Sequence, residues 1–193
     1  CFNQHQKINP FIFDVWMRIL KKNHNSILWL LSDNMYSNKN LLLETEKRGV
    51  DKNRIIFAKR LPLEDHLDRI KFGDLFLDTF PYTAHTTCSD ALRVGLPVLT
   101  LKGNSFASRV ASSLLNTLNL KELVSKNLHE YEIIANKIIN NPEYFIKLKN
   151  KLKDNLLNSP LYDSKLFTKN IEIGYEKIFS NYKNNKLLKN FEI

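Results

Sequence analysis

Along this chain, short apolar runs alternate with longer stretches in which apolar residues recur at helical spacing. The first helical stretch follows Asn9 and Pro10, an N-cap residue and a proline suited to the first turn of a helix. Its apolar positions are spaced by three and four residues, at Ile12, Val15, Trp16, Ile19 and Leu20. This spacing predicts an amphipathic helix that buries one stripe of side chains.

Apolar runs bounded by polar residues predict the strands. They lie at Ser26–Ser32, Arg54–Ala58, Leu75–Asp78 and Val98–Leu101. Cys1–Asn3 is expected to be the end of a further strand, with Gln4–Lys7 as the loop after it, and Glu122–Val124 to be a short edge strand. The runs are continuous rather than alternating, which is typical of parallel strands buried on both faces.

Helices are expected between and after these strands. Besides the helix that follows Pro10, they lie at Asn38–Arg48, Leu61–Lys71, from His85 to Gly95, Gly103–Leu118, Leu128–Asn140, Pro142–Leu157 and Asp163–Asn181. The alternation of strand and helix predicts an α/β fold with a doubly wound parallel sheet and extra C-terminal helices. We expect one domain over residues 1–182, lacking its beginning because the chain starts at Cys1, and a loose tail over 183–193.

Composition narrows the class of protein. The chain has 193 residues, of which 43% are hydrophobic and 25% charged, values typical of a folded soluble domain. No apolar run approaches the roughly 20 residues that cross a bilayer. The net charge of +9 is compatible with a nucleic-acid or membrane-surface binder. However, the lysines are scattered among asparagines without interleaved aromatics, which favours solvated surfaces and no nucleic-acid partner.

The cysteines exclude several kinds of site. Cys1 and Cys88 form no CxxC motif, and there is no His/Cys cluster at zinc spacing, so we expect neither a metal nor a disulfide. This pattern fits a reducing compartment, and we expect the protein in the cytoplasm. With His85 three residues away, Cys88 could be a nucleophile, but a small residue filling the first turn of a helix is favoured.

The stretch from Asp74 to Thr100 carries most of the candidate chemistry. A strand leads into a loop and then into a helix that begins at His85, Thr86 and Thr87. Free backbone N–H groups and hydroxyls at such a helix start can bind a phosphate. The alternative is that the threonines only cap the helix. Asp90, one turn further on, can accept hydrogen bonds from ribose hydroxyls, or it can simply compensate the helix dipole.

Other candidates lie at the carboxyl ends of the remaining strands, where open α/β sheets bind their ligands. Lys7 and Gln4 follow the first strand and can contact a pyrophosphate. His66 and Arg69 share one helix face, and their flat side chains can hold a uracil by stacking and hydrogen bonding, or can be a solvated surface. Neither GxGxxG nor GxxxxGK[ST] is present, so a dinucleotide or P-loop site is disfavoured.

These segments resemble one known family. The matching pieces are FNQHQKI, ILWLL, NRIIF, LPLEDHLDR, LFLDTFPYTAHTTCSDAL, GLPVLTL, FASRVASSLL and SPLYDSKLFT, which run in order to about Tyr175. They are similar to the donor-binding C-terminal half of the catalytic region of the O-GlcNAc transferase family, which includes the plant SPINDLY proteins. The HTT…D element followed by ASRVA is the most specific part of the match.

The resemblance implies the second Rossmann-like half of a GT-B glycosyltransferase, with residues 1–182 binding a nucleotide sugar. The activity implied is inverting and metal-independent, needs no cofactor, and moves GlcNAc or a related sugar from a UDP-sugar to Ser or Thr hydroxyls of acceptor proteins. The family's first catalytic half, which holds the acceptor site and the base, and its tetratricopeptide repeats are not in this chain. We therefore expect the chain alone to bind donor but to transfer poorly.

The resemblance also assigns roles to residues. Gln4 and Lys7 would contact the diphosphate, and Lys7 would stabilise charge on the leaving nucleoside diphosphate. The backbone of Leu61 and the side chain of Arg69 would recognise uracil, on which His66 would stack.

At the other loop, His85, Thr86 and Thr87 would hold phosphate and sugar, and Asp90 would bind the ribose. Leu63 is a departure, because animal members carry a Lys there near the ribose. Two alternatives stay open: another GT-B glycosyltransferase or a nucleotide-sugar epimerase, and a non-enzymatic basic binding module.

Overall fold

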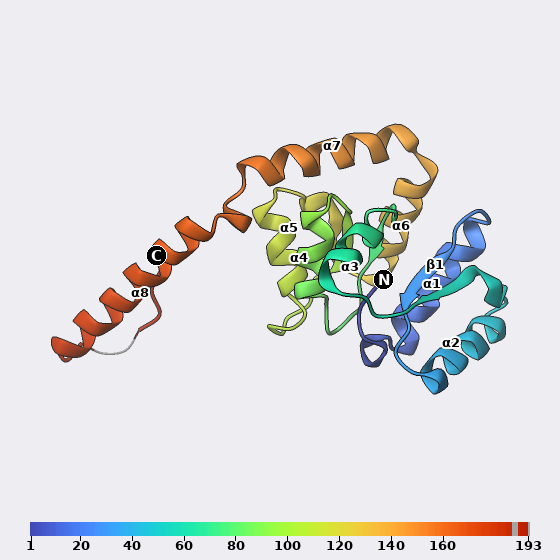
Figure 1. Cartoon of the computed structure of the whole chain (residues 1–193), viewed down its shortest axis with the longest axis horizontal. Coiled ribbons are helices and arrows are strands. Elements are labelled where there is room, and N and C mark those ends of the chain that lie inside the picture. Colours follow the sequence, from blue (N-terminus) through green and yellow to red (C-terminus); the bar gives the residue numbers. More distant parts are fainter. Residues whose placement is uncertain (187–188, 193) are drawn as a thin grey trace.

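The computed structural model describes residues 1–186 and 189–192 and shows an α/β body from which the last helix projects (Figure 1). The helices are α1 Pro10–Lys22, α2 Met35–Lys47, α3 Leu63–Ile70, α4 Thr86–Arg93, α5 Val110–Thr117, α6 Leu128–Asn140, α7 Pro142–Asn158 and α8 Ser164–Lys183. The strands are β1 Leu28–Leu31, β2 Ile55–Ala58, β3 Phe76–Leu77, β4 Val98–Leu101 and β5 Val124–Ser125.

All the strand pairs are parallel, as the continuous apolar runs predict. β1 pairs with β2, and β4 pairs with both β3 and β5. The segment Cys1–Asn3 is not a regular strand, but it lies between these two sheets. Its amino group donates to the Trp29 carbonyl in β1 at 2.8 Å, and the Asn3 amide donates to Asp78, just after β3, at 3.0 Å.

With this segment counted, the order across the fold is β2, β1, residues 1–3, β3, β4, β5. This is the doubly wound order of a Rossmann-like fold, so the predicted fold class is confirmed. The chain changes direction across the sheet between residues 1–3 and β3. The carboxyl ends of the strands at this switch point leave a crevice in which such folds bind ligands.

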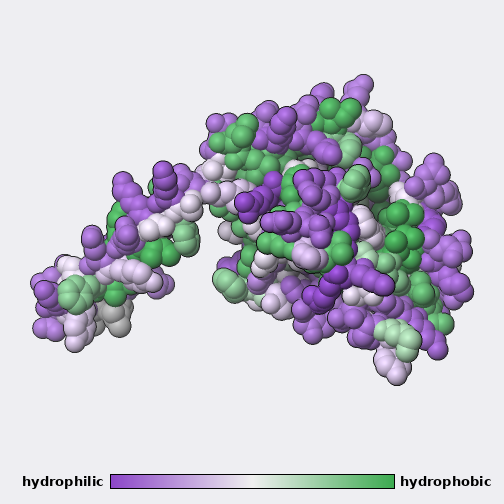
Figure 2. All heavy atoms as spheres, in the orientation of Figure 1, coloured by the Kyte–Doolittle hydropathy of each residue, from purple (hydrophilic) through white to green (hydrophobic). Residues whose placement is uncertain are grey.

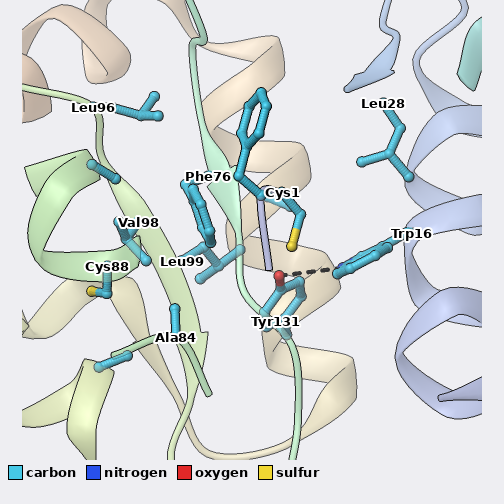
Figure 3. Packing of buried hydrophobic residues seen from close by; sticks show 14 of the residues in the cluster. Cys1, Trp16, Leu28, Phe76, Ala84, Cys88, Leu96, Val98, Leu99 and Tyr131 are labelled. Carbon is cyan, nitrogen blue, oxygen red and sulfur yellow. Dashed lines mark hydrogen bonds between the residues drawn. The ribbon is translucent and has the colours of Figure 1, made fainter. Parts of the chain in front are cut away.

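The core joins the two helices that cover one side of the switch point. Trp16 of α1 and Tyr131 of α6 are fully buried, and the Trp16 indole nitrogen donates to the Tyr131 hydroxyl at 3.4 Å (Figure 3). The Tyr131 hydroxyl in turn donates to the backbone carbonyl of Asp78 at 3.0 Å. All five apolar residues predicted to form the stripe of α1 are buried. The core therefore holds the end of β3 in place through the Tyr131 hydroxyl.

Several predicted boundaries are wrong. The helix expected from Asn38 begins at Met35, and the helix expected from Leu61 begins at Leu63. The helix expected from Gly103 begins only at Val110, because serines in the intervening segment form their own hydrogen bonds. The Ser105 amide donates to the Ser108 hydroxyl, and the Gly103 amide donates to the Ser108 carbonyl, both at 3.0 Å. Such local bonds compete with the helix. The edge strand lies at Val124–Ser125, so it begins two residues later than expected, because a 3₁₀ turn covers Lys121–Leu123.

The last helix forms as predicted but does not pack on the body. In α8 only Gly174 is buried, while large apolar side chains are exposed along its length (Figure 2). The exposed residues include Phe167, Tyr175 and Phe179. The predicted tail over 183–193 includes the last residue of α8, and its residues 187, 188 and 193 lie outside the described part. Among the residues described, no helix is long and apolar enough to cross a bilayer.

Candidate functional site

Lys7 lies at the switch point, in a 3₁₀ turn over His5–Lys7 that directly follows the first segment. Its ammonium donates to the Thr83 carbonyl at 3.1 Å and lies 3.7 Å from the centre of the Tyr82 ring. Burial lowers the pKa of Lys7, and the negative charge of Asp78 partly opposes this. A half-buried cation therefore faces the loop that leads to α4. Gln4, beside it, is exposed.

The start of α4 carries the predicted His-Thr-Thr element. His85 occupies the N-cap position, and its side chain does not cap the helix. The Thr87 hydroxyl donates to the side-chain carbonyl of Asn3 at 2.6 Å, and Thr86 is exposed. Among the described residues, neither threonine hydroxyl bonds to a backbone amide of this helix, so the alternative of plain capping is wrong. The positive end of the helix dipole is left open to solvent or to an anion.

The His85 ring packs between two loops. Its Nε2 atom lies 3.3 Å from the Ala107 carbonyl, and its centre lies 5.1 Å from that of the Tyr82 ring. Phe106 contacts it edge-on, with ring centres 6.1 Å apart. The side chain is thus held in place by the segment before α5, and the backbone of His85 starts the helix.

His66 and Arg69 form the second part of the site, on α3. The Arg69 guanidinium bonds to the His66 Nδ1 atom at 2.7 Å and to the Lys59 carbonyl at 2.6 Å. It lies 4.9 Å from the centre of the Phe2 ring, which also contacts the His66 ring at 5.2 Å. Burial and the charge of Arg69 lower the pKa of His66, so the imidazole is neutral and accepts from Arg69.

Asp90 and Leu61 are the remaining candidates at this part of the site. Burial raises the pKa of Asp90, and the neighbouring side chains of His66 and Arg93 partly oppose that rise. Leu61 precedes the N-cap of α3 and is exposed. The structure therefore joins His66 to Arg69, Lys7 to the Thr83 carbonyl and Thr87 to Asn3, and it leaves Gln4, Leu61 and Thr86 exposed.

Asp78, at the end of β3, is a central residue that the sequence analysis treated only as the flank of a strand. It is fully buried. Its Oδ1 atom accepts from the Thr79 amide at 2.8 Å, the Ala84 amide at 2.7 Å and the Asn3 side chain at 3.0 Å, and its Oδ2 atom accepts from Thr100 at 2.7 Å. Burial raises the pKa of Asp78 to about 6. The available signal was an acid directly after an apolar run.

Cys88 fills the first turn of α4, as favoured from the sequence. It is fully buried, and burial raises the pKa of its thiol well above the ordinary value, so the nucleophilic thiolate is disfavoured. Within the described part of the chain, no group of three or more His, Cys, Asp or Glu residues is arranged to hold a metal ion.

The strand order and the open helix start at the switch point define a Rossmann-like α/β domain. Its architecture matches that of a GT-B glycosyltransferase. A mutant of the O-GlcNAc transferase from Thermobaculum terrenum superposes with a TM-score of 0.86 at 33% sequence identity. The match covers 92% of this chain and 35% of that one.

The chain belongs to glycosyl transferase family 41, whose family model matches residues 1–171. It is 35% identical over 171 residues to the UDP-N-acetylglucosamine–peptide N-acetylglucosaminyltransferase of Caenorhabditis elegans, covering 89% of this chain and 15% of that protein. It is 34% identical over 181 residues to the probable UDP-N-acetylglucosamine–peptide N-acetylglucosaminyltransferase SEC of Arabidopsis thaliana, covering 93% and 18%. The chain thus spans less than a fifth of these relatives' lengths.

Proposed function

We propose that this chain is the donor-binding half of an inverting, metal-independent protein glycosyltransferase that uses UDP-GlcNAc or a related UDP-sugar. The observation that carries the proposal is the position of Lys7. Its half-buried ammonium is held against Thr83, beside the uncapped start of α4 and at the switch point of the sheet. The names of the relatives support UDP-GlcNAc as the donor, and they support a transferase rather than an epimerase.

In the proposed reaction, a Ser or Thr hydroxyl of an acceptor protein attacks the anomeric carbon of the sugar. The bond from that carbon to the diphosphate oxygen breaks with inversion, and its electron pair leaves on UDP. The hydroxyl proton goes to a base that lies outside this chain. Lys7 and the dipole of α4 stabilise the charge that develops on the departing diphosphate, and the Thr86 hydroxyl and the backbone amides of Thr86 and Thr87 hold its oxygens.

The remaining residues hold the donor. Gln4 and His85 contact the phosphates and the sugar. Arg69 and the backbone of Leu61 recognise the uracil edge, His66 stacks on its face, and Asp90 accepts hydrogen bonds from the ribose. In this assignment α3 and Asp90 hold the nucleoside end of the donor, and Lys7 and the start of α4 hold its diphosphate.

We propose that the chain works together with a first catalytic half and with tetratricopeptide repeats that select acceptor proteins. The exposed apolar side chains of α8 support this, because a lone helix with such a face is poorly suited to water. The two free buried cysteines fit the reducing cytoplasm as its location.

Calorimetric titration of UDP tests the proposal. Lys7→Ala and His66→Ala are each expected to lower the affinity at least about tenfold, because each removes a contact to a different end of the ligand. Lys21→Ala is the matched control, since Lys21 is an exposed lysine at the C-terminal end of α1, away from the switch point. Equal affinity in all four proteins would overturn the site. Salt-sensitive binding of DNA that UDP does not displace would favour a basic binding module.

A further inference from the structure

We propose that Asp78 is the positioning residue that sets Lys7 and Thr87 against the donor diphosphate, an inference that rests on the function proposed above. Asp78 itself is fully buried and does not reach the crevice. It acts through the loop that follows it and through Asn3. Its carboxylate is bonded to groups from three separate parts of the chain: residues 1–3, the loop 79–84 and β4.

The first route runs through the loop to Lys7. The Asp78 Oδ1 atom accepts the amides of Thr79 and Ala84, which brings the two ends of the loop together around one oxygen. The Thr79 hydroxyl closes the loop further by donating to the Tyr82 carbonyl at 2.7 Å. The carbonyl of Thr83, next to Ala84, then accepts from the Lys7 ammonium. The geometry of the loop therefore decides where the cation lies.

The second route runs through Asn3 to Thr87. The Asn3 amide nitrogen donates to Asp78 at 3.0 Å and to the Thr79 hydroxyl at 2.7 Å. An amide whose nitrogen is fixed in this way must present its oxygen on the other side. That oxygen accepts the Thr87 hydroxyl at 2.6 Å. Asp78 thus orients the Asn3 side chain, and Asn3 holds the first turn of α4.

The carboxylate is itself held rigidly from the core. Thr100 of β4 donates to its Oδ2 atom at 2.7 Å, and Tyr131 donates to the Asp78 backbone carbonyl at 3.0 Å. These bonds come from β4 and α6 and touch neither the loop nor Asn3, and without the Thr100 bond the three bonds to Oδ1 still hold the carboxylate. They also supply a matched control: Thr100→Val perturbs the same carboxylate on its far side.

UDP titration at pH 7.5 of the full chain and three variants tests the proposal. Asp78→Ala is expected to lower UDP affinity about tenfold or more, because both routes are lost. Asp78→Asn keeps the oxygen that serves the loop and is expected to stay within about threefold of wild type. Thr100→Val is expected to leave the affinity unchanged. A folded Asp78→Ala protein that binds UDP like wild type would overturn the proposal, as would an equal loss in Thr100→Val.

Two further measurements separate positioning from general damage. Adding Asp78→Ala to a protein that already carries Lys7→Ala and Thr87→Val is expected to cost no further affinity, since its effect passes through those residues. If Asp78→Ala does not fold, Asn3→Ala replaces it, with a loss expected from the second route alone. A full additive loss in the first case, or no loss in the second, contradicts the inference.

Hydrogen–deuterium exchange gives a readout that does not depend on UDP. Residues 79–90 and 1–9 are expected to exchange faster in Asp78→Ala but not in Thr100→Val. If wild type does not bind UDP, the proposed function fails, while the exchange measurement still decides whether Asp78 orders the two segments. Unchanged amide exchange of these residues in Asp78→Ala would by itself rule out the positioning role.

Discussion

The Thr87 hydroxyl donates a 2.6 Å hydrogen bond to the side-chain carbonyl of Asn3, which lies 84 residues earlier in the chain. Asn3 is buried, so this bond joins the first segment of the chain to the first turn of α4 across the switch point. The position of the helix start relative to Lys7 follows from it, because both depend on residues 1–7.

Replacing Thr87 by Val keeps the shape of the side chain but leaves the Asn3 carbonyl without a donor. An unsatisfied buried acceptor costs about 1–3 kcal/mol, so we expect a loss of that size in urea unfolding. UDP affinity, measured by calorimetry, is expected to fall about tenfold. Thr87→Ser retains the hydroxyl and serves as the control. Equal behaviour of the two variants would contradict a role for this bond.

The Arg69–His66 pair provides a prediction about specificity. Arg69→Lys keeps the charge but loses the planar fork that bonds His66 and the Lys59 carbonyl. We expect UDP affinity to fall about tenfold while the affinity for inorganic pyrophosphate stays the same, because only the uracil end is affected. Lys7→Ala should weaken both ligands. If Arg69→Lys weakens both equally, the pair does not lie at the base end.

Stability should depend on pH through Asp78. Its pKa is raised from 3.8 to about 6, so between these values the folded state holds a proton that the unfolded state has lost. Stability from this group is therefore present at low pH and is lost as pH rises toward 6, by an amount on the order of 3 kcal/mol.

The comparison with Asp78→Asn isolates this effect, since the amide does not titrate. In urea unfolding, wild type is expected to gain stability relative to the variant on going from pH 7.5 to 4.5. His5 and His66 titrate in both proteins, so they largely cancel from the difference. A difference that is constant with pH would show that Asp78 has an ordinary pKa.

Tyr131 tests the support of β3 by the core. Tyr131→Phe leaves the Trp16 indole nitrogen and the Asp78 carbonyl without their buried partner. We expect a loss of about 1–3 kcal/mol in the free energy of unfolding. Tyr144→Phe is the control, because the Tyr144 hydroxyl has no hydrogen bond within the described residues, and it should be nearly neutral. A loss in Tyr131→Phe no larger than that in Tyr144→Phe would show that the Tyr131 hydroxyl does not support β3.

Removal of α8 should hardly affect the body. A chain ending at Asp163 loses a helix in which only Gly174 is buried. We expect the urea midpoint of the remaining residues to be unchanged and the tendency to self-associate, measured by light scattering, to fall as the exposed apolar face is lost. A large fall in the midpoint would show that α8 packs on the body in solution.

Helical spacing and continuous apolar runs predict most of the elements, because each depends on neighbours within one or two turns. The stripe of α1 from Ile12 to Leu20 is one example. The same reasoning fails for the segment from Gly103 to Arg109, which is predicted to be helical and is not. Its pattern suits a helix, but hydrogen bonds of Ser105 and Ser108 outcompete the helical ones, and this is decided by a few local contacts.

The candidate site divides in the same way. The HTT element, Lys7 and the His66–Arg69 pair stand at the ends of predicted strands or on one face of a predicted helix, so residue type and position suffice to select them. Whether the threonines cap the helix could be settled only with Asn3 in place. An acidic residue after a strand, such as Asp78, looks the same in the sequence whether its side chain is solvated or buried.

The sequence by itself determined the order of strands and helices, the parallel sheet and the residues with suitable chemistry at the strand ends. These follow from side-chain periodicity and local backbone preference. Only the tertiary structure decided that Asp78 is buried and bonded to residues 1–3, the loop 79–84 and β4. Contacts between residues 22 and 75 positions apart arise when the sheet closes, and no local pattern encodes them.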